Sequence, residues 1–205
     1  MKTGITTIAT LLFVTTAGIH FLYAQQSFKT TTINGKTWMA ENLDVAHFRN
    51  GDPIPEAKTD KEWVKAGENK QPAWCYYYNG KVLGEPYGKI YNWYALTDPR
   101  GLAPEGWRIP DDADFKDLIQ FYQNNRDLLY AVLIKGGRSG MNVPLAGWRG
   151  RKGEFKDFEL YGTVWSATEK GKWVSYLELN PQSRGAGMRE GAKETGCYVR
   201  CISVE

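Results

Sequence analysis

The feature that most constrains the fold is the segment 102–119, which predicts a turn followed by a capped helix. Pro104 and Gly106 supply the turn. Asp111 comes directly before an apolar periodic pattern, and its carboxylate can accept a hydrogen bond from an amide of the first helical turn. Asp114, three residues later, can bond back to the N-cap backbone in the manner of a capping box. The segment therefore predicts a helix that begins next to Asp111.

The predicted helix has one apolar face. Its apolar side chains recur at i, i+3, i+4 and i+7, namely at Phe115, Leu118, Ile119 and Tyr122. We expect this face to be buried. Asp112 and Asp117 suit the positive end of the helix dipole, and we expect both to point into solvent. A calcium site is the alternative for this acidic cluster, but capping by Asp111 and Asp114 already explains two of its members.

The first 24 residues have the pattern of a secretory signal peptide. Lys2 gives a positive start, residues 5–23 contain no charged side chain, and Ala24 is a small residue before a polar segment. A membrane anchor is the alternative, but several threonines dilute the apolar run and no basic cluster follows it. We therefore predict cleavage after Ala24, a single domain over 25–205, no membrane span after cleavage, and a secreted or cell-surface protein.

The charge of the chain is nearly balanced. The sequence has 26 basic and 23 acidic residues, and the predicted leader removes only Lys2, which leaves a net charge of about +2. This balance argues against a nucleic-acid partner and against binding to an anionic membrane surface. All eight tryptophans lie beyond the leader, so aromatic burial should stabilise the core.

The three cysteines predict at most one intramolecular bridge. In an exported protein, an odd number indicates one bridge and a free thiol, or an intermolecular bond. Cys197 and Cys201 lie in one predicted strand, where four residues span roughly 13 Å, beyond disulfide reach. We favour a Cys75–Cys201 bridge with Cys197 as a small buried residue. The cysteine spacing does not fit a zinc site.

The order of the predicted elements indicates an α+β fold. Asn34-Gly35 predicts a hairpin near the start, residues 49–72 read as a long surface excursion, and a second, weaker helical pattern follows Asn125. The last third is rich in short predicted strands and ends with one at 196–202. Strands at both ends with helices between them are typical of the α+β class.

Five segments of the chain, in order, resemble the Fibrobacter succinogenes major paralogous domain family. They are 35–43 (GKTWMAENL), 87–93 (YGKIYNW), 104–110 (PEGWRIP), 165–169 (WSATE) and 199–201 (VRC). The family is similar to the C-type-lectin-like group of folds, which includes the formylglycine-generating enzymes. The resemblance implies paired N- and C-terminal strands, two helices, and long loops over small antiparallel sheets. It also implies export, but no settled activity.

The resemblance adds two expectations about single residues. The motif tryptophans are expected in the framework, together with the helix residues Asp111, Phe115 and Leu118; they are Trp38, Trp93, Trp107 and Trp165. Many family members have a cysteine directly before the Pro-x-Gly-Trp motif, where this chain has Ala103. The bridge that those members form to the final strand is absent here, which leaves Cys75 as the candidate partner of Cys201.

Aromatic rings near cationic side chains form the candidate ligand surface. Such pairs suit sugar faces, anionic glycans or protein partners, because stacking and bidentate hydrogen bonding occur together. The candidates are Trp63, Trp148, Arg149, Arg151, Trp173 and Arg184. Burial of the tryptophans in the core is the alternative. His47 is the only histidine after the leader and has no partner residues at metal or triad spacing.

These observations favour a non-catalytic binding module that needs no cofactor and recognises a glycan or an extracellular protein through its late loops and the 49–72 excursion. Two other classes stay open. The first is an enzyme related to the formylglycine-generating group, which would need Cys197 and Cys201 close together in a cleft. The second is a structural component of an extracellular assembly, with an exposed apolar patch and a stable oligomer.

Overall fold

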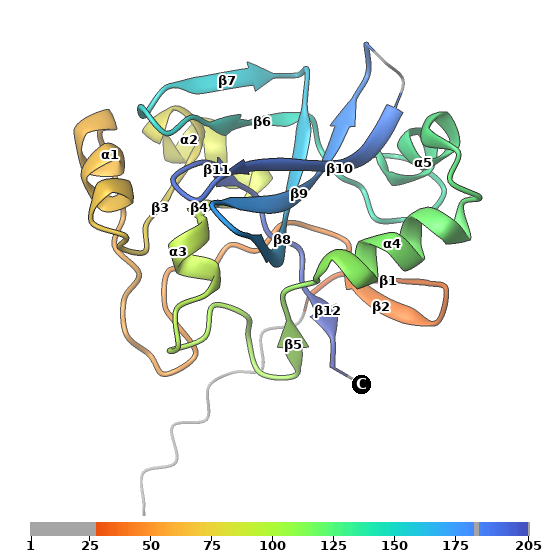
Figure 1. Cartoon of the computed structure of the whole chain (residues 1–205), viewed down its shortest axis with the longest axis horizontal. Coiled ribbons are helices and arrows are strands. Elements are labelled where there is room, and N and C mark those ends of the chain that lie inside the picture. Colours follow the sequence, from red (N-terminus) through yellow and green to blue (C-terminus); the bar gives the residue numbers. More distant parts are fainter. Residues whose placement is uncertain (1–27, 183–184, 205) are drawn as a thin grey trace, which may run out of the picture.

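The computed structural model describes residues 28–182 and 185–204 (Figure 1). The predicted leader and Arg184 lie outside these residues. The helices are α1 (Asp60–Glu68), α2 (Lys81–Gly84), α3 (Trp93–Leu96), α4 (Asp112–Phe121) and α5 (Arg126–Leu133), with 3₁₀ turns η1 (Tyr77–Asn79) and η2 (Glu85–Tyr87). No helix in this part of the chain is long and apolar enough to cross a bilayer.

The strands form three small sheets whose neighbouring strands are antiparallel. The first has the order β1-β2-β12-β5, with β1 Thr30–Ile33, β2 Lys36–Met39, β12 Ile202–Ser203 and β5 Trp107–Arg108. The second has the order β10-β9-β8, with β10 Gly185–Ala192, β9 Trp173–Asn180 and β8 Gly162–Lys170. The third has the order β3-β4-β11-β6-β7, with β3 Trp74–Cys75, β4 Ile90–Asn92, β11 Gly196–Cys197, β6 Ala146–Arg149 and β7 Phe155–Phe158. Short helices beside small antiparallel sheets make this an α+β fold.

The predicted hairpin is confirmed, and it brings the two ends of the domain together. Asn34 and Gly35 both have positive φ, at 50° and 74°, as a tight two-residue turn requires. The hairpin pairs Ile33 with Lys36 and Thr30 with Met39. On its other side β2 pairs with the C-terminal strand β12 through Trp38 and Ile202. Figure 1 shows the C-terminus leaving the molecule beside this hairpin.

Helix α4 begins where the sequence predicts. The Asp111 side chain accepts from the backbone N–H groups of Ala113 and Asp114, and the Asp114 carboxylate accepts from the backbone N–H of Asp111. Phe115 and Leu118 are buried, and Ile119 is half-buried. Helix α5 follows, with the Asn125 side chain as its N-cap. In Figure 1 both helices lie at the opposite end of the molecule from α1.

The prediction of a surface excursion over 49–72 is wrong for its central part, which is helix α1. Thr59 and Glu62 form a complete capping box there, and Trp63 is only 1% exposed. A Cβ atom on Gly196 would lie 2.7 Å from the Trp63 ring. The ring therefore enters the core because the facing strand position is a glycine.

The single closing strand predicted over 196–202 is divided between two sheets. Its first residues form β11 in the five-stranded sheet, and its last residue begins β12 in the four-stranded sheet. Between them Val199, Arg200 and Cys201 are buried. The chain passes from one sheet to the other through the interior, so Arg200 must satisfy its polar groups inside the protein.

The framework tryptophans predicted from the motifs are buried or half-buried. Trp38, Trp93 and Trp165 are at most 6% exposed, and Trp107 is half-buried. Trp38 packs against Phe115 with ring centroids 5.6 Å apart, which joins the hairpin to α4. Trp165 donates its indole N–H to the carbonyl of Tyr91. The first contact joins the four-stranded sheet to α4, and the second joins the three-stranded sheet to the five-stranded sheet.

Candidate ligand-binding cavity

The prediction of a ligand surface made of tryptophan and arginine side chains is wrong for Trp63 and Arg149, because both are buried. Trp63 and Arg149 are 1% and 0% exposed. The Arg149 guanidinium lies 4.7 Å from the Trp63 ring centroid and 4.6 Å from that of Phe155. It also donates to the carbonyls of Gly153 and Ala57 and to the side chains of Asn79 and Asp60. Stacking between two rings and four acceptors, one of them the Asp60 carboxylate, make it a buried structural residue.

The other described members of that surface are accessible but come from different places. Trp148 is half-buried on β6, where its indole N–H donates to Asp157 and Lys156 lies over its ring. Trp173 is 40% exposed on β9 of another sheet, and Arg151 is exposed in the turn after β6. Arg184 lies outside the described residues. Trp148 and Trp173 therefore belong to separate sheets, and Arg151 to a turn.

The Cys75–Cys201 bridge predicted from the sequence is not formed. All three cysteines are free and buried. Cys75 belongs to the core cluster around Trp63, whereas Cys201 and Cys197 belong to the cluster around Trp165. Burial raises the pKa of the Cys75 thiol to about 11 and that of Cys201 to about 12, and it also raises the pKa of Cys197. The thiols act as small apolar side chains.

The acidic cluster of α4 is less exposed than the sequence predicts. Asp112 does not point freely into solvent, because its carboxylate accepts from the buried hydroxyls of Ser166 and Ser175 and pairs with Lys170 at 2.9 Å. Asp114 is buried and binds Arg108 and Lys36. These contacts anchor the start of α4 to β8 and β9, to β5 and to β2. Among residues 28–182 and 185–204, no group of three or more acidic, histidine or cysteine side chains is arranged for a metal ion.

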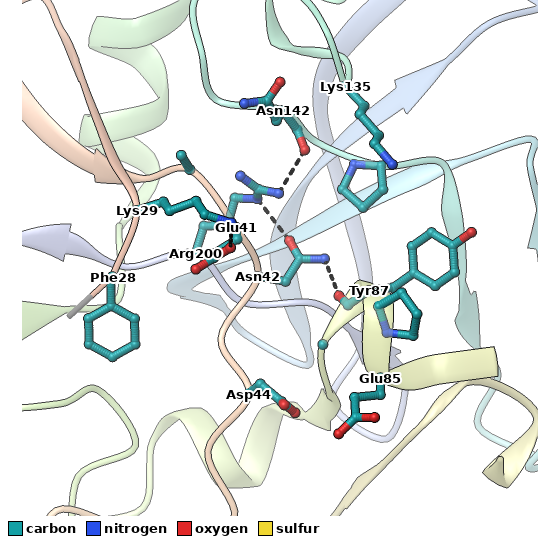
Figure 2. A pocket seen from close by; sticks show the side chains of 14 residues that line it. Phe28, Lys29, Glu41, Asn42, Asp44, Glu85, Tyr87, Lys135, Asn142 and Arg200 are labelled. Carbon is teal, nitrogen blue, oxygen red and sulfur yellow. Dashed lines mark hydrogen bonds and ion pairs between the residues drawn. The ribbon is translucent and has the colours of Figure 1, made fainter. Parts of the chain in front are cut away.

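A cavity of about 470 Å³ lies between the two terminal segments and the loops around η2 and after α5. This volume is within the roughly 300–1,000 Å³ that small-molecule sites occupy. Figure 2 shows its charged and amide side chains converging from separate segments. The lining residues are Phe28, Lys29, Ala40, Glu41, Asn42, Asp44, Glu85, Pro86, Tyr87, Gly88, Lys135, Asn142, Pro144 and Arg200.

Arg200 lies at the inner wall of this cavity and is 1% exposed. Its Nε–H donates to Asn42 Oδ1 at 2.8 Å, and Nη2 donates to the Asn142 carbonyl at 3.0 Å. Nη1 donates to the carbonyls of Met39 and Met141. Burial lowers the pKa of Arg200 to about 9, against the opposing effect of Glu41. The guanidinium is therefore a buried cation at neutral pH, held by neutral acceptors.

The amide side chains around Arg200 are fixed in one orientation. Asn42 accepts from Arg200 with its oxygen, so its Nδ2 group donates to the Tyr87 carbonyl at 2.7 Å. Asn142 accepts from the backbone N–H of Gly136 and donates to the Gly140 carbonyl. Figure 2 shows the chain of bonds from Asn142 through Arg200 and Asn42 to Tyr87. The inner wall is therefore rigid before any ligand arrives.

Each carboxylate of the cavity wall has a cationic partner. Glu41 pairs with Lys29 at 3.2 Å, and Glu85 pairs with Lys81 at 3.3 Å. Asp44 pairs with Lys89. The acidic side chains of the cavity are therefore already compensated.

The Lys89 ammonium group stands behind Asp44 in an aromatic cage. It lies 4.6 Å from the Trp74 ring centroid and 4.7 Å from that of Tyr76, and it donates to the Tyr76 hydroxyl at 3.0 Å. Lys89 is 5% exposed. The cage holds Asp44 at the cavity edge by a desolvated contact, which is stronger than an exposed ion pair.

Comparison with protein families gives a match to the Fibrobacter succinogenes major domain over residues 31–203. The chain belongs to this family. No curated protein and no solved structure matches it significantly. The resemblance seen in the motifs is thereby confirmed across nearly the whole described domain.

Three of the five family motifs meet at the cavity. The first provides Glu41 and Asn42, the second provides Tyr87 and Gly88, and the last provides Arg200. This site was not predicted from the sequence, because the predicted ligand surface rested on exposed pairs of rings and cations. The available signal was Arg200 itself, a charged residue between Val199 and Cys201 in an otherwise apolar strand, which indicates a buried cation with a dedicated environment.

Proposed function

We propose that this domain is a binding module whose cavity around Arg200 receives a short saccharide, such as the end of an extracellular glycan. The observation that carries the proposal is a preformed, mixed polar cavity whose inner wall is a buried, hydrogen-bonded guanidinium. It replaces the late loops favoured by the sequence as the recognition site, since Arg149 and Trp63 are buried.

The lining of the cavity supports a saccharide over a purely apolar ligand. Lysine, carboxylate and arginine groups offer both donors and acceptors to hydroxyls. The rings of Phe28 and Tyr87 and two prolines offer apolar surface to the C–H face of a sugar. Small-molecule sites combine such surface with a few fixed polar groups. Binding rather than catalysis accords with carboxylates that are already engaged in ion pairs.

Export and a C-type-lectin-like architecture are parts of the same proposal. The pairing of β2 with β12 and the small antiparallel sheets support that architecture. The charge pattern of residues 1–24 supports export by a cleaved leader. Sequencing of the N-terminus of the secreted protein tests the leader, and an intact Met1 on a membrane-bound protein contradicts it.

A cavity-filling variant tests the proposed function. Ala40 lines the cavity, so Ala40→Trp should place an indole in the ligand space. Ala113→Trp, at an exposed position of α4, is the matched control. On a glycan array we expect wild type and Ala113→Trp to bind the same glycans and Ala40→Trp to lose them. Glycan binding that survives in a folded Ala40→Trp variant would place the site elsewhere, and no binding by wild type would remove the proposal.

A role in assembly is the second candidate, and one surface feature favours it. Tyr78, Val82 and Leu83 are 62%, 90% and 58% exposed on the η1–α2 segment. Exposed apolar side chains close together are typical of contact surfaces. Light scattering should then find an oligomer that Val82→Glu dissociates, whereas a wild-type monomer at high concentration removes this candidate.

The buried state of the cysteines disfavours the cysteine-enzyme alternative. That alternative places Cys197 and Cys201 in a cleft, and neither lines the cavity. Their pKa values are raised by burial, which leaves little thiolate at neutral pH.

A further inference from the structure

The cations of the cavity are not all compensated in the same way. Lys29 pairs with Glu41, and Lys89, which stands behind the cavity wall, pairs with Asp44. Arg200 is held by three carbonyls and one amide oxygen, and its nearest acidic influence, Glu41, is already paired with Lys29. Lys135 makes no ion pair with the described residues. Two positive groups of the cavity therefore lack an anionic partner of their own.

The guanidinium also has more donors than protein acceptors. An arginine side chain has five N–H groups, and Arg200 donates four hydrogen bonds to protein oxygens within the described chain. Nε donates one and Nη1 two, so the remaining N–H belongs to Nη2. Its first N–H donates to the carbonyl of Asn142, a residue that itself lines the cavity. The second has no acceptor among the described residues, so it can donate to an acceptor that enters the cavity.

The position of Lys135 complements this free donor. Lys135 follows α5 and lines the cavity together with Asn142 and Pro144. Figure 2 shows it on the same side of Arg200 as Asn142, whereas Lys29 and Glu41 lie on the other side. Arg200 and Lys135 line the same cavity without a carboxylate of their own, and a ligand carboxylate between them would accept from both.

We propose that the cavity selects an acidic saccharide, one whose terminal sugar has a carboxylate that binds between Arg200 and Lys135. This inference rests on the proposed saccharide-binding function and adds its ligand class. A buried cation without an anion costs free energy, and a ligand carboxylate offsets that cost. A neutral sugar in the same place does not offset the free energy of the buried cation. The cavity should therefore bind an acidic sugar more tightly than a neutral one.

Calorimetry with matched sugars tests the inference. The probes are an oligosaccharide ending in glucuronic acid, the same oligosaccharide ending in glucose, and one ending in glucose 6-sulfate. We expect the glucuronic acid end to bind at least about tenfold more tightly than the glucose end, because hydrogen bonds between charged groups are stronger than those between neutral groups. This preference should shrink as sodium chloride is added.

Substitution of the exposed lysine separates a ligand contact from a structural effect. Lys135→Gln should remove most of the preference for the acidic end and leave the affinity for the glucose end unchanged. Lys116→Gln, at an exposed position of α4, should change neither. Arg200→Lys keeps the charge but loses the fork geometry, and it should weaken acidic binding if the variant folds. Because the Lys135 side chain makes no ion pair or hydrogen bond with the described residues, its variant decides the test.

The outcomes distinguish the two proposals. Equal affinity for acidic and neutral ends, together with loss of both in Ala40→Trp, overturns the acidic preference and keeps saccharide binding. Equal affinity for the sulfate and carboxylate ends overturns the carboxylate assignment, and so does a Lys135→Gln variant with unchanged preference. Absence of binding by every probe overturns both proposals.

Discussion

The Nε–H group of Arg200 donates to Oδ1 of Asn42 at 2.8 Å, and the two residues are 158 positions apart in the chain. The bond joins the segment that follows β2 to the segment that precedes β12. Asn42 extends the connection to the loop at Tyr87. One buried amide therefore holds three segments of the cavity wall.

Asn42→Ala should lower the free energy of unfolding by about 2–4 kcal/mol, because it leaves a buried charged donor and a carbonyl without their partner. Urea unfolding followed by tryptophan fluorescence measures this change. Asn50→Ala, at an exposed loop position, should change the free energy by less than about 1 kcal/mol. Similar small changes in both variants would show that the Arg200–Asn42 bond does not stabilise the fold.

Two phenylalanines of α4 make a matched pair. Phe115 is fully buried against Trp38, whereas Phe121 is 50% exposed at the end of the same helix. Phe115→Ala should destabilise the protein by about 3–5 kcal/mol through lost burial and a new cavity. Phe121→Ala should cost less than about 1 kcal/mol. Thermal unfolding of the two variants checks the difference, and equal losses would contradict the packing of α4.

Because of the Asp114 carboxylate, the free energy of unfolding should depend on pH in the acidic range. Burial alone would raise the pKa of Asp114, but hydrogen bonds from Arg108, the Asp111 backbone and Lys36 hold this pKa well below its usual range. The folded state then binds fewer protons than the unfolded state below about pH 4, so this stabilisation is present above that pH and is lost as the pH falls.

Asp114→Asn should lower the free energy of unfolding at pH 7 by roughly 2–4 kcal/mol and by less at pH 3. Unfolding in urea at the two pH values measures both numbers. Asp117→Asn is the control, because Asp117 contacts the same lysine but is 49% exposed. An Asp114→Asn variant that loses as much stability at pH 3 as at pH 7 would contradict the lowered pKa.

Arg149, the last residue of β6, and Arg151, in the turn that follows, should behave differently. Arg149 is buried between two rings and donates to four acceptors, whereas Arg151 is exposed. Arg149→Ala should cost more than about 2 kcal/mol, and Arg151→Ala should cost less than about 0.5 kcal/mol. Chemical unfolding compares them. A tolerated Arg149→Ala variant would return this residue to the candidate ligand surface.

The three thiols give a chemical test of the core. Since Cys75, Cys197 and Cys201 are free and buried, the native protein should not react with a thiol reagent at neutral pH. The protein unfolded in guanidinium without a reductant should react at all three positions. Counting modified cysteines by mass spectrometry checks this. A single reactive thiol after unfolding would restore the disulfide that the structure lacks.

Local patterns were sufficient for elements stabilised by neighbouring residues. Asn34-Gly35 predicts its hairpin because few other pairs adopt positive φ at both positions. Asp111 and the periodic apolar face predict α4 because a cap and a helical stripe are short-range properties. Thr59 and Glu62 form a capping box of the same kind at the start of α1. The polar residues around it did not predict a helix, and neither α1 nor the burial of Trp63 was therefore predicted.

The sequence by itself determined the family, the α+β class, the hairpin and the capped helix. The tertiary structure alone decided which acceptors hold the buried cations, because the partners of Arg149 and Arg200 come largely from distant segments of the chain. It also decided the cavity, whose walls come from both ends and the middle of the chain. A cap depends on residues three positions apart, whereas the hydrogen bond from Arg200 to Asn42 exists only after the two ends have been brought together.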